Sequence, residues 1–146
     1  MRNAVPYLNE VFYTRSKAAI KSTMSTKLEL CSVDEVAEGG ADYLVWANTP
    51  ITTLDEIKSS IEVLNKTDEA CKKAKIGFAY HNHDAEFRAV EGQIPYEMFL
   101  SQTKMQMELD LAWATKGAKD PVELFKQHPG RLPLWHVKDL DKEFKT

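Results

Sequence analysis

Four short apolar segments recur along the chain at intervals of about 30 residues, and helical spacing fills the gaps between them. The segments span residues 41–47, 76–81, 105–111 and 132–137. A strand, a helix and a further strand in this order are typical of parallel pairing. The pattern therefore predicts an α/β fold of parallel βα repeats with about four to five strands.

Local signals mark where the intervening helices begin. Thr53 and Glu56 form a capping box ahead of a long amphipathic segment. Pro95 is expected in the first turn of a short helix, and Asp120 followed by Pro121 predicts a third start. These helices belong to a region that we place at residues 32–146.

Residues 1–31 are assigned less clearly, and we expect a mainly helical N-terminal segment there. The apolar residues that suggest one amphipathic helix are Val5, Leu8, Phe12 and Ala19 or Ile20. Residues 27–31 could form a weak strand.

Charge and composition exclude several classes of protein. The net charge is -3 and the sequence pI is near 5.8, which argues against a nucleic-acid-binding protein. No apolar run approaches the roughly 20 residues needed to cross a bilayer. Residues 1–8 show no basic region followed by an apolar stretch, so we do not expect a secretory signal. We therefore expect a cytoplasmic protein that does not bind membranes. Cys31 and Cys71 are expected to be reduced and mostly buried.

Polar residues fall where three of the predicted strands end. His81 and His83 are two apart and would share a face, Asp110 ends the next strand, and His136 ends the last, with Lys138 beyond it. Carboxyl ends of parallel strands meet at one edge of a sheet, where ligands bind. Nitrogen and oxygen donors without thiolates suit Mn, Mg, Co or Zn. The alternative is that the two histidines only form hydrogen bonds or face solvent.

Two further residues lie close to this predicted site. Glu108 shares a face with Asp110, and two inward carboxylates are costly unless paired or metal-bound. Glu108 could instead belong to a structural network with a neighbouring strand. Trp113, three residues after Asp110, is placed to line a pocket, although core packing is the commoner role of tryptophan.

Three motifs resemble those of the sugar phosphate isomerase/epimerase family, in the xylose-isomerase-like TIM-barrel superfamily. They are FAYHNHDAEF at 78–87, MELDLAW at 107–113 and PGRLPLWHVKDLD at 129–141, in family order. The resemblance covers roughly residues 40–142. It implies a partial (β/α)₈ barrel, a divalent metal, and proton transfer in a sugar or sugar phosphate through an enediolate.

The resemblance also implies roles for single residues. Asp110 and His136 match metal ligands, and His81 falls where many members place a glutamate ligand. His83, Glu86 and Lys138 match positions that line the substrate pocket, and we assign them catalytic roles. Trp113 and Glu108 are assigned to substrate binding.

The family pattern has parts that this chain lacks. A closed barrel needs eight strands and typically about 250 residues, and the last family ligand is a glutamate on a later strand. We therefore expect an incomplete isomerase, or open sheet edges that pair with a second copy. A non-catalytic remnant or interaction protein is the alternative. An abasic-site endonuclease is less favoured, because its D-x-x-H pair would need histidine where Trp113 stands.

Overall fold

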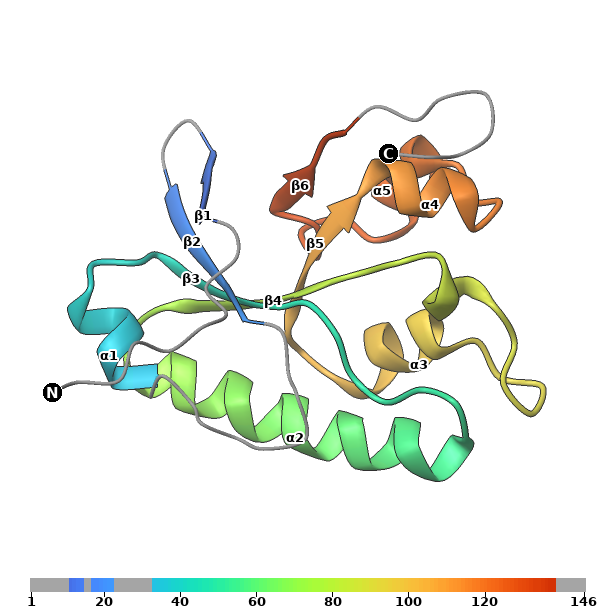
Figure 1. Ribbon diagram of the computed structural model, residues 1–146, viewed down its shortest axis with the longest axis horizontal. Coiled ribbons are helices and arrows are strands. Elements are labelled where there is room, and N and C mark those ends of the chain that lie inside the picture. The colour runs from blue at the N-terminus through green and yellow to red at the C-terminus, as the bar shows by residue number, and fades with distance from the viewer. Residues whose placement is uncertain (1–10, 15–16, 23–32, 139–146) are drawn as a thin grey trace, which may run out of the picture.

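A computed structural model describes residues 11–14, 17–22 and 33–138. Its strands form one sheet in the order β1-β2-β3-β4-β5-β6 (Figure 1). Their bounds are β1 Val11–Thr14, β2 Lys17–Ser22, β3 Tyr43–Trp46, β4 Gly77–His81, β5 Gln106–Asp110 and β6 Leu134–His136. Strands β2 to β6 pair in parallel, and β1 is antiparallel to β2. The predicted partial barrel of parallel βα repeats is confirmed.

Helices separate the strands from β3 onward. They are α1 Val33–Glu38, α2 Leu54–Lys73, the 3₁₀ helix η1 Ala85–Phe87, α3 Pro95–Gln102, α4 Leu111–Lys116 and α5 Pro121–Gln127. The Thr53 hydroxyl accepts a hydrogen bond from the Glu56 N–H, and the Asp120 carboxylate accepts one from the Val122 N–H. The starts predicted from capping signals are confirmed. Among the described helices, none combines the length and the apolar character that a membrane crossing requires.

The helix expected near the N-terminus is wrong for residues 11–14 and 17–22. Phe12 lies in β1, and Ala19 and Ile20 lie in β2, where Ala19 pairs with Tyr43 of β3. The β1 sequence VFYT consists of β-branched and aromatic residues, which favour strands over helices. Val5, Leu8 and residues 27–31 lie outside the described residues, so the boundary at residue 31 stays a prediction.

Helices cover one side of the sheet, and the main hydrophobic core lies between the sheet and these helices. Figure 1 shows α2 and α3 along this side of the sheet. Side chains that alternate along β3, β4 and β5 belong to this core together with residues of α2 and α3. The central members are Leu44, Phe78, Met107, Leu109, Ile57, Leu64 and Phe99. Cys71 is also buried here, and burial together with Asp68 raises the pKa of its thiol to about 11.

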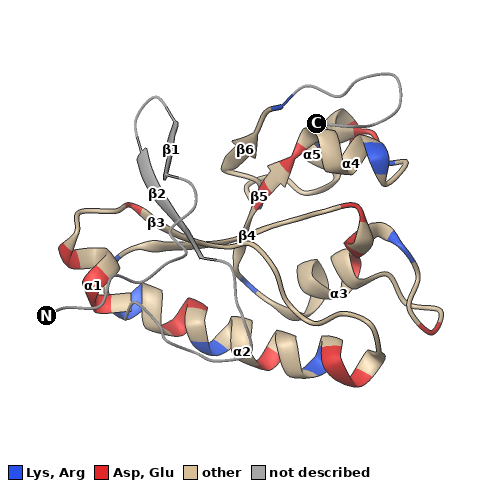
Figure 2. Cartoon of the chain, in the orientation of Figure 1, with Lys and Arg blue, Asp and Glu red and all other residues tan. Residues whose placement is uncertain are grey.

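The opposite side of the sheet begins with a small apolar layer. Tyr43, Val45, Ala79 and Leu134 form a separate buried cluster there. A Cβ added at Gly77 would lie 2.3 Å from Cε1 of the Tyr43 ring, so the missing side chain lets that ring lie against β4. Beyond this layer, toward the carboxyl ends of the strands, the same side turns polar. Figure 2 shows acidic residues on β5 there and mixed charges along α2.

Candidate metal centre

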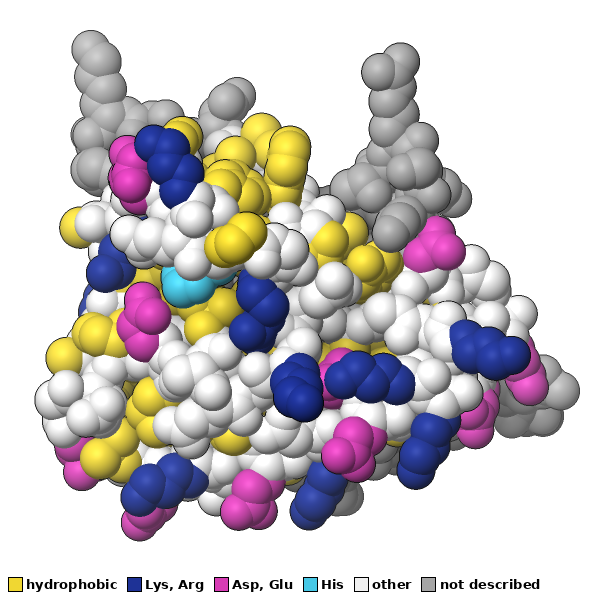
Figure 3. All heavy atoms as spheres, turned by 180° about the vertical axis from the view of Figure 1, so that it is seen from behind, with side chains coloured by type: hydrophobic (Ala, Val, Ile, Leu, Met, Phe, Trp, Pro, Cys, Tyr) yellow, Lys and Arg dark blue, Asp and Glu magenta, His cyan; other side chains and the backbone are white. Residues whose placement is uncertain are grey.

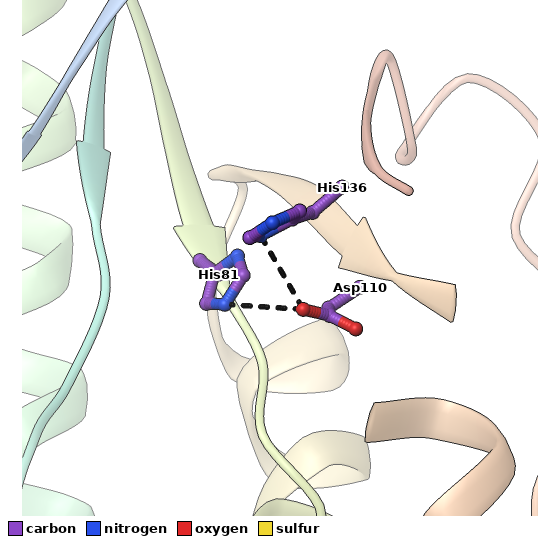
Figure 4. A group of neighbouring side chains, drawn as sticks. All are labelled: His81, Asp110 and His136. Carbon is purple, nitrogen blue, oxygen red and sulfur yellow. Dashed lines mark ion pairs between the residues drawn. The ribbon is translucent and has the colours of Figure 1, made fainter. Parts of the chain in front are cut away.

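Three neighbouring strands end in residues that can bind a metal. His81, Asp110 and His136 are the last residues of β4, β5 and β6, and Asp110 lies beside His136 in the parallel register. Each offers one ligand atom, and these atoms all lie within 4.8 Å of one another. Figure 4 shows the two imidazoles converging on the carboxylate. The structure thus brings together the three residues that the sequence nominated.

Asp110 lies at the centre of this group and is fully buried. Its Oδ1 accepts a hydrogen bond of 2.8 Å from the Trp113 N–H and thereby caps α4. Its Oδ2 lies 3.3 Å from His136 Nδ1, 3.2 Å from Lys138 Nζ and 3.6 Å from His81 Nε2. Within the described residues this oxygen accepts no hydrogen bond of good geometry. A buried carboxylate oxygen is stabilised by cationic neighbours; Lys138 supplies one here, and the two imidazoles offer nitrogen ligands for a metal ion beside the same oxygen.

The donor set fits a divalent cation. The distance of 3.6 Å between Asp110 Oδ2 and His81 Nε2 is too long for a hydrogen bond. Two ligands that each bind one ion at about 2.0–2.2 Å stand roughly this far apart. Two imidazoles and one carboxylate, without a thiolate, suit the borderline and hard divalent metals. The site's own side chains therefore support the predicted cofactor, while the identity of the metal stays open.

Glu108 lies behind His81 and away from solvent. Its Oε1 is 2.8 Å from His81 Nδ1, and Glu108 is only 4% exposed. The strand register explains the contact, because His81 of β4 pairs with Glu108 of β5. The structural network considered from the sequence is therefore present. The substrate-binding role assigned to Glu108 stays a prediction.

His83 and Glu86 form a second group beside the first. The Glu86 carboxylate accepts hydrogen bonds from the Tyr80 hydroxyl at 2.7 Å and from the His83 N–H at 2.9 Å, and it lies 3.9 Å from His83 Nδ1. Burial raises the pKa of Glu86. The hydrogen bonds from His83 and Tyr80, together with the charge of His83, outweigh burial and leave that pKa below its usual value. Burial, reinforced by Glu86, raises the pKa of Tyr80 well above the usual value.

Trp113 lies at the rim of the site among charged and aromatic groups. Its ring centroid is 5.6 Å from that of His83, and Lys138 Nζ and Lys116 Nζ lie 4.1 Å and 4.5 Å from the Trp113 ring. Lys138 thus contacts both the indole face and the central carboxylate. These positions suit the pocket-lining roles predicted for Trp113 and Lys138 without testing them.

Two features of the site were missed from the sequence. Asn82 is fully buried, and its Oδ1 accepts a hydrogen bond of 3.0 Å from the Asp110 N–H, which ties β4 to the end of β5. Helix α4 begins directly after Asp110, at Leu111, which the sequence placed at the end of the strand, and no helix was predicted over the following residues. An aspartate three residues before a donor N–H is an ordinary N-cap signal, and it could have been recognised.

Comparison with solved structures gives the site a context. A sugar phosphate isomerase/epimerase from Parabacteroides distasonis matches with a TM-score of 0.70 and 33% identity, over 82% of this chain and 51% of that one. A second from the same organism matches with a TM-score of 0.68 and 35% identity, over 73% and 43%. The resemblance to the sugar phosphate isomerase/epimerases is confirmed. No family model and no curated protein matches the sequence.

The chain spans about half the length of these sugar phosphate isomerase/epimerases. The similarity therefore establishes the partial barrel and the kind of protein that this chain resembles. The activity, substrate and metal of a whole isomerase/epimerase are proposals for this chain.

Proposed function

We propose that this chain carries the metal-binding half of a divalent-metal-dependent sugar or sugar phosphate isomerase/epimerase. The observation that carries the proposal is the convergence of His81, Asp110 and His136 at three adjacent strand ends. The likeness to two sugar phosphate isomerase/epimerases supports it. The substrate class that follows is a small sugar or sugar phosphate with a carbonyl next to a hydroxyl-bearing carbon.

The three strand-end residues would hold the cation, which would act as a Lewis acid on neighbouring oxygens of the sugar. His83 would move the proton next to the carbonyl, on the path through an enediolate. Its side chain is 34% exposed, and its ring centroid lies 5.0 Å from that of His81. Glu86 keeps a lowered pKa and lies 3.9 Å from His83 Nδ1, so an ionised carboxylate lies beside the His83 ring.

Two residues at the rim would place the substrate. The Trp113 indole offers an apolar face of the kind that stacks on a sugar ring. Lys138 Nζ lies between that face and Asp110 Oδ2, where it would meet a substrate oxygen or phosphate. A cation bound by Asp110 would repel the ammonium group and favour its turning toward the substrate.

Equilibrium dialysis with Mn²⁺ tests the metal site directly. We expect about one ion per chain, and its loss in the Asp110→Ala and His136→Ala variants. Asp68→Ala and His128→Ala are matched controls, because neither residue belongs to the strand-end group. Absence of Mn²⁺ binding by the unaltered chain would overturn the proposal.

A second candidate function is the non-catalytic binding or interaction protein considered from the sequence. Assays with a panel of keto-sugars and their phosphates, with and without Mn²⁺, separate the two. Metal-dependent turnover that is lost in His83→Ala supports the isomerase/epimerase. Metal binding without turnover supports the alternative for the chain alone. Sedimentation of the same samples tests the predicted pairing with a second copy.

A further inference from the structure

We propose that Glu108 is a positioning residue that holds the proton of His81 on Nδ1 and so presents Nε2 as the metal-binding nitrogen. The inference rests on the proposed metal site and assigns a role that the sequence did not. In this role Glu108 acts through the His81 imidazole and does not contact the substrate, contrary to the substrate-binding role predicted from the sequence.

The Glu108 and His81 side chains are shielded from solvent, and the strand register sets their relative position. Glu108 Oε1 lies 2.8 Å from His81 Nδ1, and the two side chains are 5% and 1% exposed. Parallel pairing of β4 with β5 places the two residues in register. The imidazole therefore has little room to rotate, and no bulk water competes for Nδ1.

The chemistry of the two groups decides which nitrogen carries the proton. A neutral imidazole has one donor and one acceptor nitrogen, whereas an ionised carboxylate only accepts. The contact of 2.8 Å between Glu108 Oε1 and Nδ1 therefore places the proton on Nδ1 when Glu108 is ionised. The nitrogen that remains as the acceptor is Nε2, on the side of the ring that faces Asp110 Oδ2 at 3.6 Å.

This arrangement places two lone-pair donors opposite each other. His81 Nε2 and Asp110 Oδ2 cannot bond each other when neither carries a proton, and both can bind one cation. A carboxylate behind a ligating histidine fixes the ring and strengthens its ligand nitrogen, and removing such a partner typically lowers metal affinity about 10- to 100-fold. Tighter metal binding would thus offset the free-energy cost of burying the Glu108 carboxylate.

The first test reads the proton position without any metal. Two-bond ¹H–¹⁵N spectra of ¹⁵N-histidine-labelled protein at pH 8 distinguish the two neutral tautomers. Single His→Gln variants assign the four histidines. We expect His81 to carry its proton on Nδ1 in the unaltered chain. A proton on Nε2, or on both nitrogens, would overturn the proposal.

The second test couples that reading to metal affinity. We expect Glu108→Ala to lose the fixed tautomer and to bind Mn²⁺ about 10- to 100-fold more weakly. Glu108→Gln keeps an acceptor oxygen of the same reach, so we expect the tautomer to persist and the affinity to stay within a few-fold. Asp68→Ala removes another buried carboxylate, on α2, and should change neither reading.

Circular dichroism and urea unfolding of each variant exclude loss of the fold as the cause. If the tautomer changes and the Mn²⁺ affinity does not, or the reverse, the positioning role is wrong. If the unaltered chain binds no Mn²⁺ but holds the Nδ1 proton, the proposed function fails while the assignment of Glu108 to the His81 ring stands.

Discussion

The two sides of the sheet are built from alternate residues of the same strands, yet one side forms the hydrophobic core and the other carries the candidate metal site. The side that faces α2 and α3 is apolar from one strand end to the other. The opposite side is apolar only in its first layer, and it then carries His81, Glu108, Asp110 and His136. Figure 3 shows the molecule from behind, where acidic and basic side chains are intermixed and no large patch of one charge forms.

The difference shows how one strand serves folding and chemistry together. Because side chains alternate with a period of two, Met107 and Leu109 pack into the core while Glu108 and Asp110 face the site. A variant on the helix-facing side should lower stability without affecting metal binding. A variant on the polar side should weaken metal binding without lowering the stability of the metal-free chain.

The largest expected effect lies on the helix-facing side. Phe99 of α3 is fully buried, and its ring centroid lies 5.0 Å from that of Tyr80. Phe99→Ala should lower the free energy of unfolding by about 3–5 kcal/mol, because it removes apolar contacts and leaves a cavity. Urea unfolding monitored by circular dichroism measures the change.

The control for that variant is Val122→Ala, at a side chain that is 57% exposed, where the change should stay within about 0.5 kcal/mol. Equal destabilisation by the two variants would mean that the helix-facing core does not dominate stability.

Metal binding on the polar side should add to the stability of the chain. At a free Mn²⁺ concentration 100 times the dissociation constant, binding should raise the free energy of unfolding by about 2.7 kcal/mol. His136→Ala should remove this gain. Urea unfolding with and without Mn²⁺ measures both quantities, and a gain that persists in His136→Ala would place the ion elsewhere.

The apolar layer beneath the site offers an intermediate case. Gly77→Ala would place a methyl group 2.3 Å from the Tyr43 ring and force that ring to move. We expect a loss of about 1–3 kcal/mol by overpacking, measured by thermal or urea unfolding. In a Tyr43→Ala background the same substitution should cost much less, and an undiminished cost would assign the strain to the backbone instead.

Much of this two-sided arrangement could be predicted from the sequence. Apolar periodicity located the four strands from 41 onward, and strand ends located the ligand candidates, because both follow from local geometry. The position of Glu108 against His81 could not be predicted, since it depends on the register between β4 and β5. Helix α4 was missed because Asp110 was assigned to the metal, although it also caps that helix.

The N-terminal error has a different origin. Residues of β1 gain their backbone hydrogen bonds from β2, and β2 from β3. A helical spacing of a few apolar residues cannot outweigh such tertiary pairing. The residues of β1, VFYT, offered a local strand signal, whereas β2, KAAIKS, could be assigned only with knowledge of the sheet that it joins.

The smallest expected effect concerns Glu86, where the two sides meet. Its carboxylate accepts a hydrogen bond from Tyr80, whose ring belongs to the core, and another from His83 beside the site. Since the pKa of Glu86 is lowered in the folded chain, its contribution to stability is present above the usual glutamate pKa of 4.5 and is lost as the pH falls through the folded value. Urea unfolding at a series of pH values between 3 and 7 measures this loss.

Glu86→Gln should flatten that part of the pH profile, because an amide does not titrate. Glu69→Gln, at an exposed carboxylate of α2, is the matched control and should leave the profile as it is in the unaltered chain. If Glu86→Gln kept the acid loss in full, other carboxylates would account for it. The link between the core and the site would then depend on the shape of the η1 turn and not on the charge of Glu86.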